Sequence, residues 1–167
     1  LAKHPELKSR VRCVFTWAGA VGGSEVADDA LENLQRSRMR KGALDVAGAL
    51  KGMLPPGLRL GRYAGRRLTE FDVGGALRDL TTGARRAFLA ENAARIDALD
   101  IPMFYVKGAT HLSEVPMSQR GGFGLLAKID SVNDMQVTGR GATLPFAMAT
   151  ELATVRGHHW DIAYPSF

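Results

Sequence analysis

Cysteine is nearly absent from this chain: Cys13 is the single one among 167 residues. One cysteine excludes an internal disulfide and any zinc site built on several cysteine thiolates. Cys13 lies in the apolar stretch 11–17 (VRCVFTW), which favours a buried and inert thiol over a reactive one. The redox compartment of the protein therefore stays open.

Long apolar runs are also lacking. No run approaches the roughly 18–20 apolar residues that a membrane-spanning helix needs. Residues 1–7 (LAKHPEL) have no apolar core of a secretory signal, which favours a cytoplasmic location. The chain begins with Leu rather than Met, so a preceding leader stays an open question. The content of 46% hydrophobic and 23% charged residues is that of an ordinary globular domain.

Acidic residues are scarce between Arg36 and Arg86, where four acids accompany twelve of the chain's 22 basic residues. Such a segment can attract an anionic partner. A non-catalytic module that binds through this basic helical segment is therefore the alternative function. Few aromatic side chains lie among the arginines to stack on bases, so a solvated face is favoured and no nucleic acid is expected.

The pattern of apolar residues predicts an α/β domain with a parallel sheet. Strands are expected at 11–18, where β-branched and aromatic residues run up to a glycine, at 101–108, which glycine again closes, and at 149–155, which ends just before a glycine. The first run is almost continuously apolar, which is typical of a strand covered on both faces. Helical periodicity is expected at 28–34, 41–53, 71–80 and 84–99, and the first seven residues resemble the tail of a helix. Residues 109–148 are expected to form a loop.

Reactive groups in open parallel sheets gather beyond the carboxyl ends of the strands. An aspartate-rich turn at 130–134 (DSVND) follows the second strand, and 157–161 (GHHWD) follows the third. An acid and a histidine in this arrangement suit a hydrolytic relay. The histidine takes a proton from a nucleophile, and the carboxylate fixes the tautomer of the imidazole.

The segments 11–24 (VRCVFTWAGAVGGS), 101–108 (IPMFYVKG), 133–137 (NDMQV) and 157–161 resemble the C-terminal half of an α/β-hydrolase of the lipase and esterase type. The resemblance implies a C-terminal part of the parallel hydrolase sheet, of about three strands, in residues 1–23 and 98–167. Residues 24–97 would form a helical cap. The family order of serine, acid and histidine assigns the acid to Asp134 and the histidine to His159, with His158 as the alternative.

The nucleophile of that family is missing. No Gly-x-Ser-x-Gly elbow exists in the chain, and Ser24 lies in 22–26 (GGSEV), without the closing glycine. The resemblance therefore implies an elbow upstream of Leu1, in a missing N-terminal half of the same fold. The whole protein is expected to hydrolyse a small carboxylic ester without a cofactor, and this chain alone is expected to be inactive.

Other interpretations of the same residues stay open. Asp130 is a second candidate for the acid, and either aspartate can simply cap its turn. The glycine-rich loop 19–23 follows a strand as phosphate-binding loops do, but it matches no nucleotide-binding motif. Two adjacent histidines on an extended chain point to opposite faces and have no evident third partner, so no metal site is expected. The aromatic residues are expected in the core, namely Trp17, Phe104, Tyr105 and Trp160.

Overall fold

The computed structural model describes residues 4–41, 72–117 and 120–163. The helix expected at 41–53 lies outside these ranges apart from its first residue, and so does most of the basic segment between Arg36 and Arg86.

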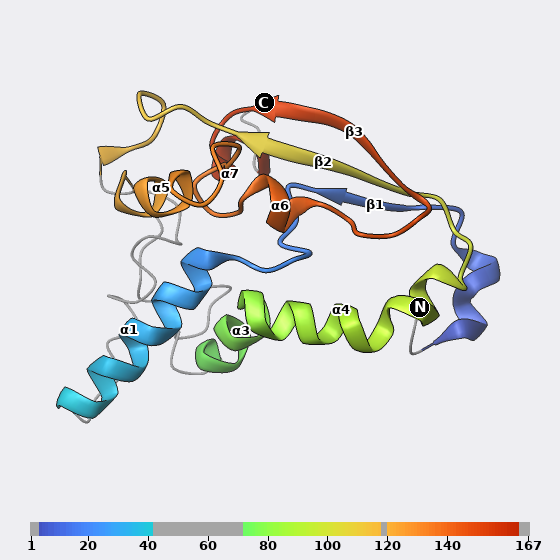
Figure 1. The fold of residues 1–167 in the computed structure, drawn as a ribbon, viewed down its shortest axis with the longest axis horizontal. Coiled ribbons are helices and arrows are strands. Elements are labelled where there is room, and N and C mark those ends of the chain that lie inside the picture. The colour runs from blue at the N-terminus through green and yellow to red at the C-terminus, as the bar shows by residue number, and fades with distance from the viewer. Residues whose placement is uncertain (1–3, 42–71, 118–119, 164–167) are drawn as a thin grey trace, which may run out of the picture.

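Three parallel strands form the sheet, in the order β1-β2-β3. They are β1 (Val14–Trp17), β2 (Met103–Ala109) and β3 (Ala149–Arg156). The three predicted strands and their parallel pairing are confirmed, with boundaries shifted by a few residues. All three point the same way, so their carboxyl ends lie together beside α5, α6 and α7 (Figure 1).

Helices α1 (Glu25–Lys41), α3 (Val73–Leu80) and α4 (Thr82–Asp97) come between β1 and β2. Side chains cap two of these helices: Asp72 accepts from the Gly75 amide at 2.8 Å, and Thr81 accepts from the Ala84 amide at 3.3 Å. These caps satisfy donors that have no partner in the first helical turn. They place the start of α4 directly after α3, and the helices expected at 71–80 and 84–99 are confirmed with these new boundaries.

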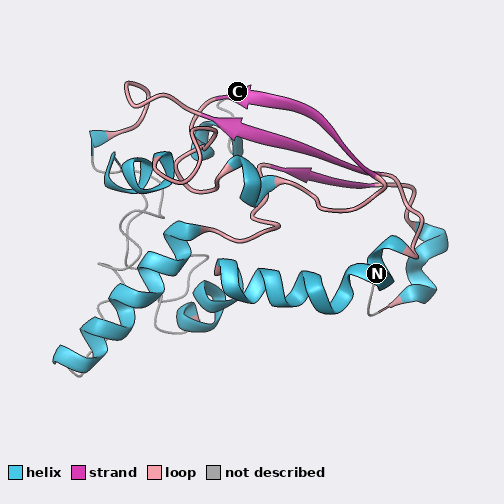
Figure 2. Cartoon of the chain, in the orientation of Figure 1, coloured by secondary structure: helices cyan, strands magenta, loops and turns pink. Residues whose placement is uncertain are grey.

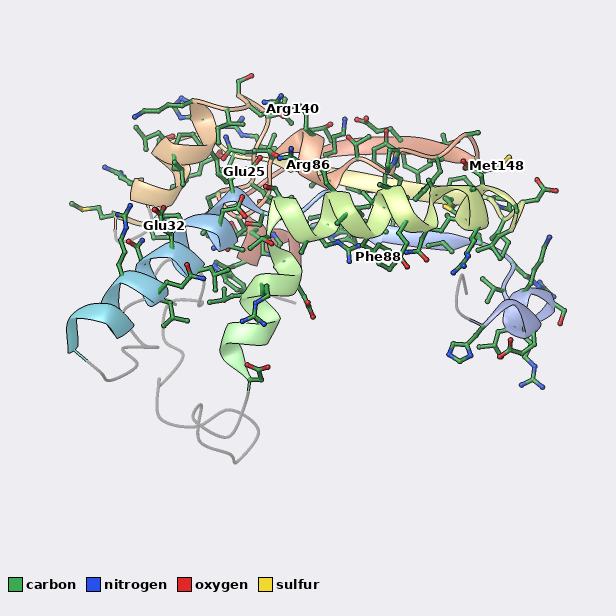
Figure 3. The ribbon with its side chains drawn as sticks, turned by 60° about the horizontal axis from the view of Figure 1, so that its bottom comes forward. Glu25, Glu32, Arg86, Phe88, Arg140 and Met148 are labelled. Atoms are coloured by element: carbon green, nitrogen blue, oxygen red, sulfur yellow. The ribbon has the colours of Figure 1, made fainter. Side chains whose placement is uncertain are left out.

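One face of the sheet carries the core. Met103 and Tyr105 of β2 are buried there with Leu144, and Ile96 of α4 packs against the same cluster. Helix α4 runs along the strands, as Figures 1 and 3 show, and Phe88 lies near its middle. The region expected to be the cap, 24–97, therefore includes a helix that contacts the sheet, and the division into cap and core stays a prediction.

The opposite face is more open than the sequence suggests. Phe15 and Trp17 alternate with the inward residues of β1 and keep 48% and 50% of their surface exposed. The expectation that this strand is covered on both faces is therefore wrong within the described residues, and so is the core placement of Trp17. Cys13 is also exposed, because it precedes β1 outside the packed part of the strand.

Three short helices are not expected from the apolar pattern, namely α5 (Arg120–Ala127), α6 (Gly139–Ala142) and α7 (His159–Ala163), and Figure 2 draws them in cyan. The 3-10 helix η1 (Pro5–Arg10) overlaps the helix tail expected in the first seven residues. The sequence predicts a loop where α5 lies because three of its eight residues are glycine, which has a low helix propensity. Burial of Leu126 stabilises this helix instead. None of the described helices is long and apolar enough to cross a membrane.

Candidate active site at the carboxyl edge of the sheet

The turn that carries Asp134 holds the carboxylate by its own backbone. One carboxylate oxygen, Oδ1, accepts hydrogen bonds from the amides of Gln136 at 3.0 Å and Val137 at 2.8 Å. Met135 between them has φ of +72°, a left-handed conformation that is uncommon for a side chain of this size. Asn133 accepts from the Met135 amide at 3.1 Å and closes the turn. The side chain of Asp134 is 1% exposed, and its second oxygen, Oδ2, is left for another partner.

That partner is His159, the first residue of α7. Its Nδ1 atom lies 2.8 Å from Oδ2 of Asp134, and its backbone amide donates to the Asp134 carbonyl at 2.8 Å. A carboxylate only accepts hydrogen bonds, so we assign the proton of this contact to Nδ1. In the neutral imidazole the other nitrogen, Nε2, is then an acceptor. The His159 side chain is 22% exposed, which leaves its ring within reach of a ligand.

Gly108 of β2 makes this pairing sterically possible. A Cβ atom at position 108 would lie 2.6 Å from Cβ of Asp134 and 2.7 Å from Cδ1 of Ile162 in α7. Such separations are far below van der Waals contact, so any side chain here would displace the acid or the histidine helix. A glycine at the end of a strand is a weak sequence signal, and only the packing identifies this one as part of the site.

A cavity of about 420 Å³ opens beside His159. Its walls come from the end of β1 and the loop after it, the acid turn, α3 and α7. Most of them are apolar and none is an acid, an arginine or a lysine. The lining residues are Trp17, Ala18, Gly19, Ala20, Ser24, Leu80, Gln136, Val137, His159, Trp160 and Ala163. The two tryptophans expected in the core thus line this cavity, while Tyr105 lies in the core as expected.

Ser24 lines the cavity, but its hydroxyl is engaged. It donates to the Gln136 carbonyl at 2.6 Å and accepts from the Ala27 amide at 3.3 Å, as a residue at the start of α1. The side chain is buried. Ser24 therefore connects the start of α1 to the acid turn and is not placed as a nucleophile.

The other sequence candidates lie in different surroundings. Asp130 accepts from the amides of Val132 and Arg140 at 3.0 and 3.1 Å, which is the bonding of a turn-capping residue. His158 contacts Asp161 rather than Asp134, with Nε2 3.2 Å from a carboxylate that is 68% exposed. The structure thus brings together Asp134 and His159, and it brings neither Asp130 nor His158 into that pair.

Three backbone amides of the glycine-rich loop after β1 donate hydrogen bonds to carbonyls of the protein itself. The Val21 amide donates to Gly19 at 2.9 Å, Gly22 to Gly141 at 2.7 Å and Gly23 to Ala20 at 3.2 Å. Phosphate-binding loops direct such amides at the ligand instead. In the part of the chain that the structure describes, no group of three or more histidine, cysteine or acidic residues is arranged to hold a metal ion.

An ion pair at the surface joins the loop after β2 to the end of β3. Glu114, in the loop after β2, pairs with Arg156 at the end of β3 at 2.7 Å. The hydrogen bond from Arg156 lowers the pKa of Glu114, and a hydrogen bond from the His111 amide adds to this effect. In the middle of the sheet, Lys107 lowers the pKa of Glu151 in the same way.

No protein-family model matches the chain, and no curated protein matches it either. Solved structures, however, do match the chain. The metagenomic carboxyl esterase MGS0156 matches 95% of the chain at 26% identity with a TM-score of 0.61. The mature lipase BlEst2 of Bacillus licheniformis matches 95% at 22% identity with a TM-score of 0.58. The three parallel strands and their helices are therefore part of an α/β-hydrolase fold. The chain spans 40% of the esterase and 52% of the lipase.

Proposed function

We propose that this chain is part of a serine-dependent hydrolase of carboxylic esters, in which His159 is the general base and Asp134 orients it. The observation that carries the proposal is the 2.8 Å contact between a buried carboxylate and the imidazole beside an apolar cavity. Similarity to a carboxyl esterase and a lipase supports the same reaction class.

In this reaction Nε2 of His159 takes the proton of a serine hydroxyl while the serine oxygen attacks the ester carbonyl. The tetrahedral intermediate collapses, the bond to the alcohol oxygen breaks, and the imidazolium returns the proton to the leaving alkoxide. Water then attacks the acyl-enzyme by the same route and releases the acid. Asp134 stabilises the imidazolium and keeps the ring in the tautomer that exposes Nε2.

The nucleophile is proposed to come from a segment outside these 167 residues. Ser24 is committed to the Gln136 carbonyl and to the start of α1, and the sequence has no nucleophile elbow. In the described part of the sheet β1 is an edge strand, so its outer edge is open to a further strand. A strand added there would end beside the cavity, which is where a serine has to lie to reach His159.

The substrate is proposed to be a small neutral ester. The cavity wall offers apolar surface from Trp17, Leu80 and Val137, and apart from His159 it contains no ionisable side chain. A charged group in such a wall would lose its hydration without gaining a partner. The basic segment of the alternative binding hypothesis lies mostly outside the described residues, so that hypothesis stays a prediction.

The test uses the product of the complete reading frame, assayed with a fluorophosphonate probe and with short p-nitrophenyl esters. His159→Ala is expected to lower kcat by on the order of 10⁴-fold or more. His111→Ala is the matched control, because His111 is exposed and contacts only its own loop. A His159→Ala variant as active as the control contradicts the proposal.

The 167-residue chain gives a second test. We expect the fluorophosphonate probe to leave it unlabelled, since the hydroxyl of Ser24 donates to a backbone carbonyl. Labelling of Ser24, located by peptide mass spectrometry, would show that the nucleophile lies within this chain.

A further inference from the structure

The helix that carries His159 is too short to hold itself in place. α7 has five residues, from His159 to Ala163, and an isolated helix of that length is unstable in water. The direction of the His159 ring therefore depends on what fixes the two ends of α7. Any rotation of this helix changes the distance between Nδ1 of His159 and Oδ2 of Asp134.

The first end is fixed by the residues around His158. The Gly157 amide donates to Ala109 at 2.9 Å, and the His159 amide donates to Asp134 at 2.8 Å. The Nδ1 atom of His158 accepts from the Asp161 amide at 3.3 Å, which is the position and bonding of an N-cap. Nε2 of the same ring contacts the Asp161 carboxylate at 3.2 Å.

The other end is fixed from a distant strand. The Nε1 atom of Trp17 donates to the Ile162 carbonyl at 2.9 Å, across 145 residues of sequence. Carbonyls in the last turn of a helix lack a partner within the helix, so this bond satisfies one of them. The Ile162 side chain is buried and lies above Gly108, beside Asp134.

We propose that Trp17 is a positioning residue for His159. Its indole N–H anchors the C-terminal end of α7 to β1, and this anchor keeps the imidazole directed at Asp134. The half-exposed indole of Trp17 therefore has a role beyond lining the cavity. The inference deepens the proposed function, and it rests on that function only for its consequence in catalysis.

Nuclear magnetic resonance of the ¹⁵N-labelled 167-residue chain tests the geometry without any need for activity. The chain has four histidines and two tryptophans, so the ring nitrogens are few enough to assign. His159→Gln identifies the His159 signals, and Trp160→Phe separates the two indoles. At about pH 9, where imidazoles are neutral, the ¹⁵N shifts report which ring nitrogen carries the proton.

In the wild type we expect His159 as the Nδ1–H tautomer, and we expect the Trp17 indole proton to be protected from exchange. Trp17→Phe keeps an aromatic ring and removes the donor. We expect it to reduce the Nδ1–H population of His159 and to raise amide exchange in 159–163 about three- to tenfold, as loss of one hydrogen bond does. Phe15→Leu is the matched control, because Phe15 lies on the same face of β1 and carries no hydrogen-bonding group.

Two outcomes overturn the inference. One is a Trp17→Phe chain that keeps the wild-type tautomer and the wild-type exchange in α7. The other is a Trp17 indole proton in the wild type that exchanges as fast as that of a free indole. This second measurement does not need Trp17→Phe, so it decides the question even where that variant does not fold.

The proposed function is tested separately, by enzyme kinetics. In the product of the complete reading frame, Trp17→Phe is expected to lower kcat more than it changes KM for an acetyl ester, which fills little of the cavity. If the tautomer depends on Trp17 while His159→Ala keeps full esterase activity, the positioning role stands and the hydrolase proposal fails. If His159 is essential for activity and its Nδ1–H population is unchanged in Trp17→Phe, only the positioning role fails.

Discussion

The acid turn and the histidine helix meet at one hydrogen bond, but they are held in different ways. Asp134 is buried in a turn whose amides, from Gln136 and Val137, bind its own carboxylate. His159 begins a five-residue helix that depends on neighbours, including Trp17 from the far end of the chain. The acid is thus positioned locally, whereas the histidine is positioned by tertiary contacts. The following changes test that difference.

Gly108→Ala is expected to have the largest effect because it affects both regions. The new Cβ would lie 2.6 Å from Cβ of Asp134 and 2.7 Å from Ile162. We expect a loss of about 2–3 kcal/mol in the free energy of unfolding, as for overpacked sites, measured by urea titration. Gly83→Ala is the control: its Cβ meets nothing within 4 Å, and a helical alanine is favourable. Equal stability of the two variants would contradict the tight contact.

Ser24→Ala tests the acid side. It removes the hydrogen bond to the Gln136 carbonyl at 2.6 Å and the side-chain cap on the Ala27 amide. We expect a loss of about 1–2 kcal/mol in the same titration. Ser113→Ala, at an exposed position, is expected to change stability by less than about 0.5 kcal/mol. A Ser24→Ala chain as stable as this control would mean that α1 and the acid turn are not coupled through Ser24.

His158→Ala tests the histidine side with a smaller expected effect. The variant loses the N-cap of α7, and we expect a loss of about 0.5–1 kcal/mol. His158→Asn is the control, because asparagine is a favourable N-cap and replaces the lost acceptor. Both variants are compared by thermal unfolding and by amide exchange in 159–163. If alanine and asparagine behave alike, the cap contributes nothing to α7.

The smallest effect is expected from the surface ion pair between Glu114 and Arg156 near these two regions. Arg156 lowers the pKa of Glu114 in the folded chain below its ordinary value. The pair therefore stabilises the fold at pH values above the ordinary pKa of glutamate, where the carboxylate is charged. This contribution disappears as the pH falls through the lowered pKa. Glu114→Gln is therefore expected to lower the Tm slightly near pH 7, and the difference from the wild type should shrink as the pH is lowered into the acidic range.

Salt and a charge-matched variant separate this pair from general charge effects. About 0.5 M NaCl should shrink the Tm difference at pH 7, because exposed ion pairs are screened. Glu91→Gln removes the same charge from an exposed position of α4. A Glu114→Gln difference that does not shrink as the pH is lowered, or that Glu91→Gln reproduces at pH 7, would contradict a specific pair with Arg156.

Much of the sheet is predictable because its signals are local. The strands β1 and β2 are largely apolar runs, β3 ends just before a glycine, and the helix α4 repeats its apolar residues at helical spacing. Helix α5 is not predictable in this way, because its glycines hide a helix that buried contacts stabilise. The exposure of Cys13 and Trp17 is likewise not local, since it depends on what packs over each face of the sheet.

The sequence by itself determined the parallel α/β order and the succession of an acid turn and a histidine after consecutive strands, because hydrophobic period and chain order are properties of neighbouring residues. It did not exclude Asp130 as the acid in place of Asp134, or His158 as the histidine in place of His159, because the alternative residue has the same chemistry and lies close by in the sequence. Only the tertiary structure decided which pair meets. The left-handed backbone at Met135 shapes the turn that holds the Asp134 carboxylate. The absence of a side chain at Gly108 leaves room for that carboxylate. The hydrogen bond from Trp17 helps to fix α7, which directs His159 toward Asp134. The contacts of Gly108 and Trp17 join residues far apart in the chain, and no local pattern records them.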